Sequence, residues 1–535
     1  MKRPFASCKT ARNGNPPAQP PSPSGLNNVT VKKNKPTTPA DSKLPNAGAV
    51  LQSAGAGLPS GAPSKRICVI GCGTLGSYLI RRLLDLYGGA VEIIAVEMGD
   101  HKIRNEEEMG VTAEAGNTNV ASLGRYFGLG GTSARWGGQV LFFDKRDNPE
   151  NDPIWAEIIR INRKHQQTVL EQLLGNTARF VSINPEASGG ELSASLKTGV
   201  WLRYNRRNLY KRMVRPVRSR VQLKTNRRIV GFQVEGNRIG AVVLKSADGK
   251  VEHLTADRFY LTAGALESCR LMLKLQADFP ELHQQNTGKN FGDHISTELF
   301  VVQDARPVLD GIDFTPQVVN GSLVTKRIVA LAGNGMVGFV HFVFNKDIRA
   351  FKFLKEMLFG KMSTSIGIKD LLQGAGFLLR FAWGMLVAKR LYVHPGQWSV
   401  QLDMEQAVPN SNSLALADLP DRYGEPALRI NWDISKKDKE AIADVRNQVE
   451  ALLRRNKLKF KAKYDPAVTG NKVEDVYHPV GFLPVGSVVS MTGKVKGLEN
   501  LWHFSTAMLP SARSINPTAA VMCHIEEHLE EEAAG

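Results

Sequence analysis

The clearest hydrophobic pattern in the chain lies between residues 67 and 96. Residues 67–70 (Ile-Cys-Val-Ile) form an apolar run that is too short for a helix and is bounded by glycine, so they predict a buried strand. Apolar residues at helical spacing follow from Leu75 to Leu84, and a second apolar run follows at 91–96. The order strand, tight turn, helix, strand predicts a β-α-β unit of about thirty residues.

Further strand-like runs occupy the middle of the chain. Three of them, separated by turn residues, predict a three-stranded meander at 229–234, 239–244 and 257–262. A helix is expected from Leu266 through Leu275. Ser435 is a good N-cap for a second helix, whose apolar stripe includes Ile442 and Val445. Later runs predict that residues 301–434 build an antiparallel sheet as a separate layer, and these runs are 299–302, 339–344, 398–405, 413–417 and 427–432.

The composition is that of a large folded chain with a polar N-terminal extension. The 535 residues are 42% hydrophobic and 22% charged, which excludes a wholly disordered chain and predicts two or three domains. Residues 1–66 contain 11 of the 27 prolines and carry ten Lys/Arg against Asp41 alone, so they hold +9 of the net charge of +18. We expect residues 1–66 to be a disordered, basic, proline-rich tail. Because the excess charge is peripheral and no recognition motif accompanies it, we expect no nucleic-acid partner.

A second basic stretch is also rich in apolar residues. Residues 345–392 hold nine Lys/Arg against three acidic residues, interleaved with Phe and Leu. Arg380 and three glycines interrupt the apolar runs, which argues against a transmembrane helix. The segment 346–392 has two interpretations: two ordinary helices of a substrate domain, or a basic amphipathic pair that contacts an anionic membrane peripherally or covers a long apolar substrate.

The cysteines and the N-terminus bear on the compartment. The five cysteines are scattered, odd in number and without C-x-x-C spacing, so neither a metal site nor a disulfide framework is expected. The N-terminus lacks the apolar run of a secretory signal. We therefore expect a cytoplasmic protein, which the membrane interpretation of 346–392 would place against the inner membrane surface.

A glycine-rich turn follows the first predicted strand. It reads Gly71-Cys72-Gly73-Thr74-Leu75-Gly76, between strand and helix, where the helix N-terminus offers its amides to a pyrophosphate. Glu97 stands 21 positions beyond Gly76, at the end of the second strand, where a carboxylate can bind the hydroxyls of an adenosine ribose. These residues predict a dinucleotide site, and both NAD and FAD fit it.

Four later blocks separate the two cofactors. They are residues 128–138 with Gly130-Gly131-Thr132-Ser133, residues 263–268 (Ala-Gly-Ala-Leu-Glu-Ser), residues 288–294 (Gly-Lys-Asn-Phe-Gly-Asp-His), and a C-terminal run that contains His478-Pro479-Val480-Gly481 and Asn516-Pro517-Thr518. With the first glycine turn, these blocks resemble the glucose-methanol-choline (GMC) family of FAD-dependent oxidoreductases, in the family's order.

The resemblance implies a fold, a cofactor and a set of binding residues. The fold is α/β, with a Rossmann-like FAD-binding domain and a second, substrate domain built on an antiparallel sheet. It implies domain limits of 67–300 for the main FAD-binding part, 301–469 for the substrate domain and 470–535 for the return to the FAD domain. The cofactor-binding residues that it implies are Gly71, Gly73, Thr74, Leu75, Gly76, Glu97, Gly130, Gly131, Thr132, Ser133, Val230, Ala263, Ser505, Thr506 and Pro517.

By the same resemblance, His478 and Asn516 match the family's catalytic pair. Oxidation of an alcohol removes a hydroxyl proton and a hydride, so a base near the hydroxyl lowers the barrier, and an imidazole suits that task. The Asn516 amide would hold the same oxygen. Asn516 and Pro517 are also explained as the N-cap and first-turn proline of a last helix over 519–532.

The sequence thus predicts an FAD-dependent dehydrogenase or oxidase acting on a CH–OH group of an alcohol, polyol or sugar, with the electron acceptor unspecified. Arg135 stands where one branch of the family has a flavin-linking His, so noncovalent FAD is expected. Two alternatives stay open: a lyase of the same fold that keeps FAD structurally, and a non-enzymatic binding protein that uses the basic tail.

Overall fold

The computed structural model describes residues 65–115, 124–181, 191–304, 306–344, 379–380, 382–384, 386–391, 398–466 and 472–534. The tail expected at 1–66 therefore lies outside the described residues except for Lys65 and Arg66, and so does most of the segment 346–392. The description below concerns the compact unit that spans residues 61–535.

A parallel sheet forms the nucleotide-binding half. Its five strands lie in the order β22-β10-β1-β2-β6 and all pair in parallel. The predicted β-α-β unit is confirmed, because α1 connects β1 to β2. Both faces of such a sheet are covered, which explains why its strands are continuous apolar runs. The bounds are β1 Lys65–Ile70, α1 Thr74–Tyr87, β2 Val91–Val96, β6 Val221–Lys224, β10 Arg258–Leu261 and β22 Leu501–His503.

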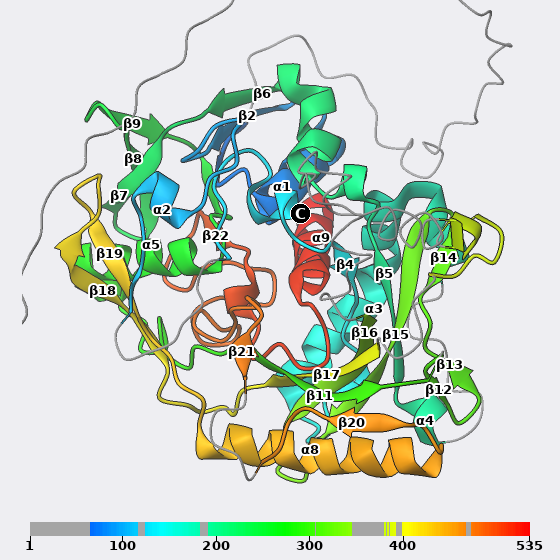
Figure 1. The fold of residues 1–535 in the computed structure, drawn as a ribbon. Helices are drawn as coiled ribbons and strands as arrows, with labels where there is room; N and C mark the ends of the chain where they lie inside the picture. Colours follow the sequence, from blue (N-terminus) through cyan, green and yellow to red (C-terminus); the bar gives the residue numbers. More distant parts are fainter. Residues whose placement is uncertain are drawn as a thin grey trace, which may run out of the picture. The chain divides into compact units, whose positions relative to one another are not determined.

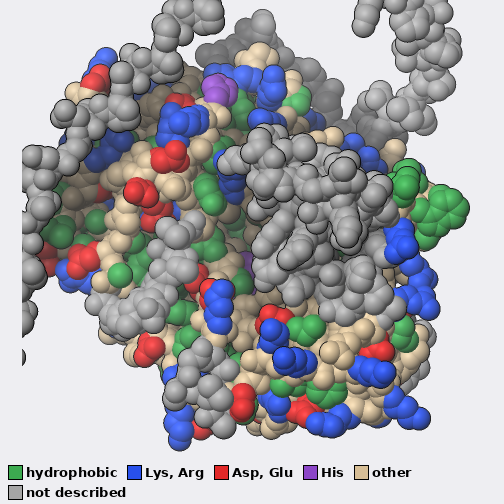
Figure 2. All heavy atoms as spheres, viewed as in Figure 1, with side chains coloured by type: hydrophobic (Ala, Val, Ile, Leu, Met, Phe, Trp, Pro, Cys, Tyr) green, Lys and Arg blue, Asp and Glu red, His purple; other side chains and the backbone are tan. Residues whose placement is uncertain are grey.

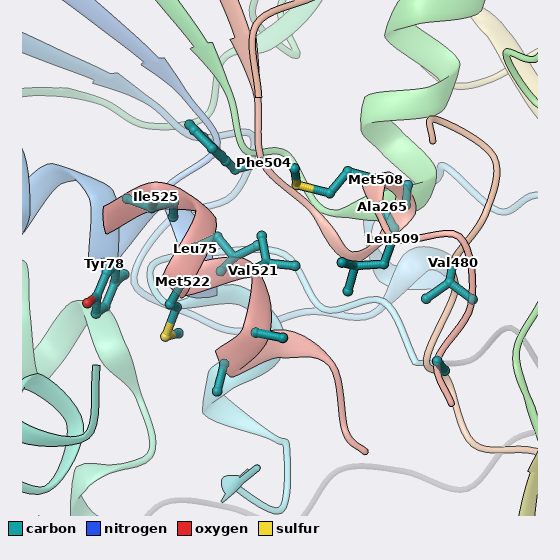
Figure 3. Close-up of a cluster of buried hydrophobic side chains, with 14 of the residues drawn as sticks. Leu75, Tyr78, Ala265, Val480, Phe504, Met508, Leu509, Val521, Met522 and Ile525 are labelled. Carbon is teal, nitrogen blue, oxygen red and sulfur yellow. The ribbon is translucent and has the colours of Figure 1, made fainter. Parts of the chain in front are cut away.

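The C-terminal helix α9 (Thr518–Ala534) packs between two other helices. It contacts α1 and the long helix α3 (Pro153–Leu174), and in Figure 1 it runs through the middle of the molecule. Figure 3 shows Val521, Met522 and Ile525 of α9 beside Leu75 and Tyr78 of α1. The apolar contact of α9 with the start of α1 brings the C-terminal segment back to the first glycine turn.

The predicted meander is wrong in its third strand. The meander consists of β7 (Arg228–Glu235), β8 (Arg238–Lys245) and β9 (Val251–Thr255), while residues 258–261 form β10 of the parallel sheet. A short apolar run carries no local mark of whether its partner is parallel or antiparallel. The expected helix at 266–275 is confirmed as α5, Ala265–Asp278.

A large, mainly antiparallel sheet forms the second half. Its main path is β20-β11-β17-β16-β15-β5-β4, with β14 beside β15 and β21 beside β11. It differs from the sheet expected at 301–434, because β18 and β19 leave it to pair with β3, and strands on both sides of that range enter it. The bounds are β3 Glu114–Ala115, β4 Gln139–Val140, β5 Leu196–Trp201, β11 His294–Val302, β14 Gln317–Val319, β15 Ser322–Leu331, β16 Val337–Phe344, β17 Trp398–Glu405, β18 Ser413–Pro420, β19 Pro426–Asn431, β20 Phe460–Ala462 and β21 Glu474–Asp475.

Helix α8 (Lys436–Arg455) covers one face of the large sheet, along the bottom of Figure 1. Its buried stripe includes Ile442, Val445 and Val449, and the helix contacts β17. The predicted N-cap is confirmed, since Ser435 Oγ accepts a hydrogen bond from the Asp438 amide at 3.2 Å in a capping box.

Short elements complete the described chain, and none of its helices is long and apolar enough to span a bilayer. The architecture is thus α/β, with a Rossmann-like parallel sheet and a second layer built on an antiparallel sheet, as predicted. The proposed domain limits at 300 and 469 stay a prediction. The short elements are α2 Glu106–Met109, α4 Glu191–Ala194, β12 Val308–Leu309 and β13 Ile312–Asp313.

Candidate active site

A pocket with about 970 Å³ of empty space opens at the carboxyl ends of the parallel strands. Its position matches that of ligand sites in open α/β sheets. Eleven predicted site residues line it, and they are Gly71, Gly73, Thr74, Leu75, Glu97, Gly131, Thr132, Ala263, His478, Ser505 and Thr506. Lining residues that the sequence did not single out for binding include Arg125, Tyr126, Trp136, Tyr477 and Thr518.

The first glycine turn brings backbone close to backbone. Gly71 has φ +95°, and a Cβ there would lie 2.7 Å from the Cα of Ala263. At Gly76 a Cβ would lie 1.9 Å from the Gly71 carbonyl oxygen, so this glycine allows α1 to pack on the turn. Because α1 has no side-chain cap at its N-terminus, its first amides are left for a ligand.

Glu97 is buried at the end of β2 and lines the pocket. One of its carboxylate oxygens accepts from the Cys72 amide at 2.9 Å, and the other accepts from the amides of Gly99 and Gly128 at 3.0 and 3.1 Å. Burial raises the pKa of Glu97, and the backbone hydrogen bonds oppose that rise. The carboxylate therefore ties both glycine-rich loops together at the place where the ribose is expected.

The second glycine loop divides into lining and supporting residues. Gly131 and Thr132 line the pocket, whereas Gly130 and Ser133 do not. The Ser133 hydroxyl donates to the Gly130 carbonyl at 2.5 Å and accepts from the Leu209 amide at 3.0 Å. Ser133 therefore shapes the loop from behind.

Four further predicted residues lie off the lining. Val230 is buried in β7, Gly76 packs α1 onto the turn, and Pro517 and Asn516 stand just before α9. The amide expected to cap the last helix does not do so: α9 begins at Thr518, and both polar atoms of the Asn516 side chain contact other side chains.

Ser505 and Thr506 stand where many GMC members have Asp-Ala, and their hydroxyls hold the segment in shape. Ser505 Oγ accepts from the Ala507 amide at 3.2 Å and so caps a short turn, as an aspartate would. Thr506 Oγ1 donates to the Pro479 carbonyl at 2.7 Å, which positions the residue after His478.

A row of four side chains runs from the large sheet to the pocket. His294 of β11 lies beside His478, with 2.9 Å between their Nδ1 atoms. Nε2 of His478 lies 3.0 Å from Nδ2 of Asn516. Arg327 of β15 donates from Nη2 to Oδ1 of the same amide. We call His294, His478, Asn516 and Arg327 the catalytic row, after the role predicted for His478 and Asn516.

The hydrogen bonds of the catalytic row have one consistent direction. His294 Nε2 lies 2.6 Å from the Arg513 carbonyl oxygen, so this nitrogen carries a hydrogen. In the neutral ring His294 Nδ1 is then an acceptor, and Nδ1 of His478 donates to it. Nε2 of His478 therefore holds a lone pair. Because Arg327 occupies the oxygen of Asn516, the amide turns its NH₂ toward that lone pair.

Asp293 fixes the positions of the two histidines relative to each other through their backbone amides. Its Oδ1 accepts from the amide of His294 at 2.7 Å and from the amide of His478 at 2.8 Å. Asp293 is buried, and burial raises its pKa well above the usual range. The Asp-His pair of the 288–294 block thus has a structural explanation: the aspartate joins the block to the segment of His478.

The surroundings keep His478 neutral. Burial, together with the neighbouring His294 and Arg327, lowers the pKa of His478 to about 3, and Asp403 opposes this shift. Burial likewise lowers the pKa of His294 to about 4. Burial lowers the pKa of the Arg327 guanidinium to about 9, which leaves it a cation at pH 7. The row therefore pairs a neutral base with a buried positive charge.

The residues of the pocket fit an extended dinucleotide. Two glycine loops approach closely, since a Cβ at Gly131 would lie 3.0 Å from the Cα of Gly73, and α1 starts between them with uncapped amides. Phosphate oxygens suit such amides, and the buried carboxylate of Glu97 stands at one end of the pocket while His478 stands in its wall. FAD would be held by these two loops and by Glu97, and when bound it would supply the acceptor for a hydride.

Comparison with known proteins agrees with this class of site. Residues 409–524 match the family model described as GMC oxidoreductase. Among solved structures, the chain is similar to pyridoxine 4-oxidase from Mesorbium loti, with a TM-score of 0.55 and 14% identity, over 88% of this chain and 99% of that chain. Comparison with curated protein sequences gives no match.

The fold is α/β, and the pocket lies at the carboxyl ends of its parallel strands, as nucleotide sites do in such folds. The matched segment confirms the predicted resemblance to the GMC family and contains most of the C-terminal run, including His478 and Asn516. Residues 409–524 are thus similar to the C-terminal domain of the GMC oxidoreductases, and the likeness of the whole chain to a solved structure concerns the fold.

Proposed function

We propose that the protein oxidises a CH–OH group of an alcohol, polyol or sugar, with His478 as the base and Asn516 as the group that holds the reacting oxygen. The observation that supports this proposal is the directed hydrogen bonding of the catalytic row, which leaves an unprotonated nitrogen at Nε2 of His478. FAD, when bound, supplies the acceptor for the hydride.

His478 suits the proton-transfer step because it is neutral and oriented. The substrate hydroxyl would give its proton to Nε2, and the resulting imidazolium would keep its Nδ1–H bond to His294. The carbon that bears the hydroxyl then loses a hydride, and the product is the carbonyl compound. Withdrawal of the proton matters because the hydride leaves readily only when the oxygen gains alkoxide character.

Asn516 is placed to hold the same oxygen. Its NH₂ donates to Nε2 of His478, so an alcohol oxygen that replaces this hydrogen bond can accept from the amide and donate to the imidazole. Arg327 donates to the other end of the amide and supplies a buried positive charge near the developing alkoxide. Such fixed donors lower the barrier without reorganising during the reaction.

We propose that FAD binds noncovalently. Arg135, at the position of a flavin-linking His in one branch of the family, is exposed, and its guanidinium lies 5.9 Å from the ring centre of Tyr126. The test is acid precipitation of the purified holoenzyme, after which the yellow chromophore should stay in the supernatant.

Anaerobic mixing with alcohols, polyols and sugars tests the reaction itself. We expect at least one of these compounds to bleach the flavin absorbance. Absence of bleaching in an FAD-loaded protein that performs another reaction would favour the lyase with structural FAD. A protein that takes up no FAD would leave only the non-enzymatic binding protein.

The His478→Ala variant tests the assignment of the base. We expect bound FAD to stay in place and anaerobic reduction by substrate to slow by about 100-fold or more. His253→Ala is the matched control, because His253 is exposed on β9, outside the pocket lining. Equal reduction rates in the two variants would refute the role of His478.

A further inference from the structure

One face of the large sheet is polar where it meets the catalytic row. In antiparallel strands, directly paired residues share a face, and so do residues two positions apart. The register pairs Arg327 with His341, His341 with Gln401, and Gln401 with Glu298, which places all four on one face. We define the polar face as these four residues together with three on the same side: Ser296, Thr325 and Asp403.

The opposite face of the same strands is mainly apolar and carries Ile295, Ile328, Val340, Phe342, Val400, Leu402 and Met404. Helix α8 lies on this side, since the Arg446 guanidinium lies 5.3 Å from the ring centre of Phe300, which pairs with Val400. The first face is polar except for Phe339, which pairs with Asp403 and lies under the Arg327 guanidinium, and for Val329 and Val343 beside it.

The polar face joins the catalytic row directly. Arg327 belongs to both, because its guanidinium donates to Asn516. His294, which bonds to His478, lies on β11 two residues before Ser296 and on the same side. From this buried end the face becomes more open: His341 and Gln401 are half-buried, and Glu298 is exposed. A substrate with its hydroxyl at His478 would therefore extend over this face.

Several polar atoms of the face have hydrogen-bonding capacity left over. Arg327 Nε is buried without a hydrogen-bond partner. Gln401 Nε2 donates to Ser296 Oγ at 2.6 Å and to Asp403 Oδ1 at 3.2 Å, and its side-chain oxygen Oε1 accepts from no side chain in these contacts of the described residues. Polar atoms left without partners under a bound ligand are costly, so the face favours a ligand that supplies them.

We propose that the polar face binds the remote part of the substrate, and that the substrate is an uncharged polyhydroxylated compound, a sugar or polyol. This inference rests on the proposed function. Hydroxyl groups both donate and accept, so they suit a face that holds a cation, Arg327, and an anion, Asp403, whose pKa is held well below its usual range. The carboxylates of Asp403 and Glu298 would repel an anionic substrate, and the guanidinium of Arg327 would repel a cationic one.

The test compares ligands of equal carbon number on the His478→Ala holoenzyme, where binding can be read without turnover. Flavin absorbance changes are recorded with glucose, sorbitol, gluconate and 1-hexanol. We expect glucose or sorbitol to bind at least ten-fold more tightly than gluconate and 1-hexanol, because a site built for hydroxyls rejects analogues that lack them. Tighter binding of 1-hexanol or gluconate, or binding by neither sugar nor polyol, would overturn the proposal.

Gln401→Leu provides the residue-level test. The change keeps the size of the side chain and removes its hydrogen bonds, so we expect affinity for the preferred polyol or sugar to fall about ten-fold or more. The control is Gln222→Leu on exposed β6, which should leave affinity unchanged. Equal affinities in the two variants would refute the contact.

The outcomes separate this inference from the proposed function. Suppose that sugars bind and that Gln401→Leu weakens this binding, but that no sugar bleaches the flavin of the wild-type holoenzyme. The proposed role of the polar face would then be supported, and the proposed oxidation would be refuted. If the flavin is bleached only by apolar alcohols, the reaction stands and the polar face falls.

A second, independent observation concerns an exposed apolar segment. Four large hydrophobic side chains stand out within nine residues: Leu379 is 72% exposed, Trp383 65%, Leu386 71% and Val387 56%. Figure 2 shows hydrophobic side chains protruding at the right edge, beside Lys and Arg, near the place of β14 in Figure 1. Such a cluster on a folded chain marks an interaction surface.

Positive charge accompanies these side chains. Arg380, Lys389 and Arg390 are exposed within the same stretch, and the sequence has no acidic residue between Asp370 and Asp403. The end of the stretch is fastened to β14, since the Val318 amide donates to the Lys389 carbonyl at 2.7 Å. We infer that the exposed side chains of Leu379, Trp383, Leu386 and Val387 dock on an anionic lipid surface, because an exposed Trp and Leu pair flanked by cations suits the headgroup region.

Vesicle sedimentation of the full-length holoenzyme tests the docking. We expect binding to phosphatidylserine-containing vesicles and at least ten-fold weaker binding by the double variant Trp383→Glu, Leu386→Glu. The control is Leu419→Glu, which adds an acid at a 67% exposed leucine on β18 and leaves the basic tail identical. Equal sedimentation of all three proteins would assign any binding to the tail and overturn the inference. An apolar patch that instead joins two copies would show as a dimer that the double variant dissociates.

Discussion

The nucleotide end and the substrate end of the site are built in different ways. The nucleotide end is formed mainly by backbone atoms. Two glycine loops lie in contact there, and the Glu97 carboxylate links them by accepting hydrogen bonds from three backbone amides. At the substrate end, side chains from β11 and β15 contact His478 and Asn516. Backbone sites demand glycine at set spacings, whereas side-chain sites accept many residue types on one scaffold.

The difference separates the features that this chain shares with other dinucleotide-binding proteins from those that are specific to this chain. The nucleotide end repeats an arrangement that serves any dinucleotide of this class. By the proposals above, the polar face and the Arg327 charge are what suit the site to this chain's own substrate. Substitutions at the first end should therefore abolish cofactor binding, and substitutions at the second should change the reaction while FAD stays bound.

The largest effect is expected for Gly71→Ala. The new methyl group would lie 2.7 Å from backbone atoms of Thr262 and Ala263, at φ +95°, so the turn must move. We expect FAD affinity to fall by about 100-fold or more, equal to about 2.7 kcal/mol, as measured by titration of the apoprotein.

Gly249→Ala is the control for the effect of φ alone. Gly249 has φ +85° with nothing within 4 Å of its added Cβ, so it shares the strained conformation without the clash. We expect a loss of about 1 kcal/mol in the free energy of unfolding and unchanged FAD affinity. If both variants lost FAD equally, close approach at the first turn would not explain cofactor binding.

A smaller effect is expected at His294, which acts through His478. His294→Phe keeps the ring but removes the acceptor of the His478 Nδ1–H, so the basic nitrogen is no longer fixed at Nε2. We expect flavin reduction to slow by about ten- to 100-fold with FAD still bound, because the lost hydrogen bond and freed tautomer together cost about 1–3 kcal/mol.

His294→Gln should rescue much of that loss. The glutamine oxygen can accept from His478 while its NH₂ donates to the Arg513 carbonyl, as the two nitrogens of His294 do now. If the Phe and Gln variants reduced at the same rate, His294 would be a packing residue only. Stopped-flow reduction with a saturating substrate separates the two outcomes.

The contrast between the two ends also explains what the sequence could predict. The residues from Gly71 to Glu97 are contiguous, and their glycines have few other uses, so the β-α-β unit and its ligand class followed from spacing. His478 and Asn516 were found by the resemblance, because a His-Pro pair alone is a common turn. His294 stood inside a matched block, yet nothing local indicated that its ring would meet His478.

Arg327 and the polar face gave no usable signal. Arg327 follows Lys326 in a run that looks like the charged edge of a strand, and only the register with His341 shows which charge points inward. The strand at 258–261 was misplaced for a related reason, since parallel pairing with β1 depends on residues about 190 positions away. Which strand these residues pair with, and which of their side chains point inward, depends on residues far away in the sequence, so the local pattern cannot predict either.

The smallest effect, and the sharpest test of the substrate end, is a change of pH dependence in Arg327→Gln. The neutral form of His478 is the active base, so flavin reduction should hold constant as pH falls from 7 and drop only as pH approaches the lowered pKa of about 3. Removing the Arg327 cation removes one cause of that lowering, so the pKa of His478 should rise. The acidic limb, meaning the fall of the reduction rate at low pH, should then move to higher pH. Burial is the larger cause and persists, so the limb should stay below the ordinary histidine range. Arg327→Lys keeps the charge and should keep the limb in place even if it disturbs Asn516. A limb that moved equally in both variants would mean that the geometry of the amide, and not the buried charge, controls the base.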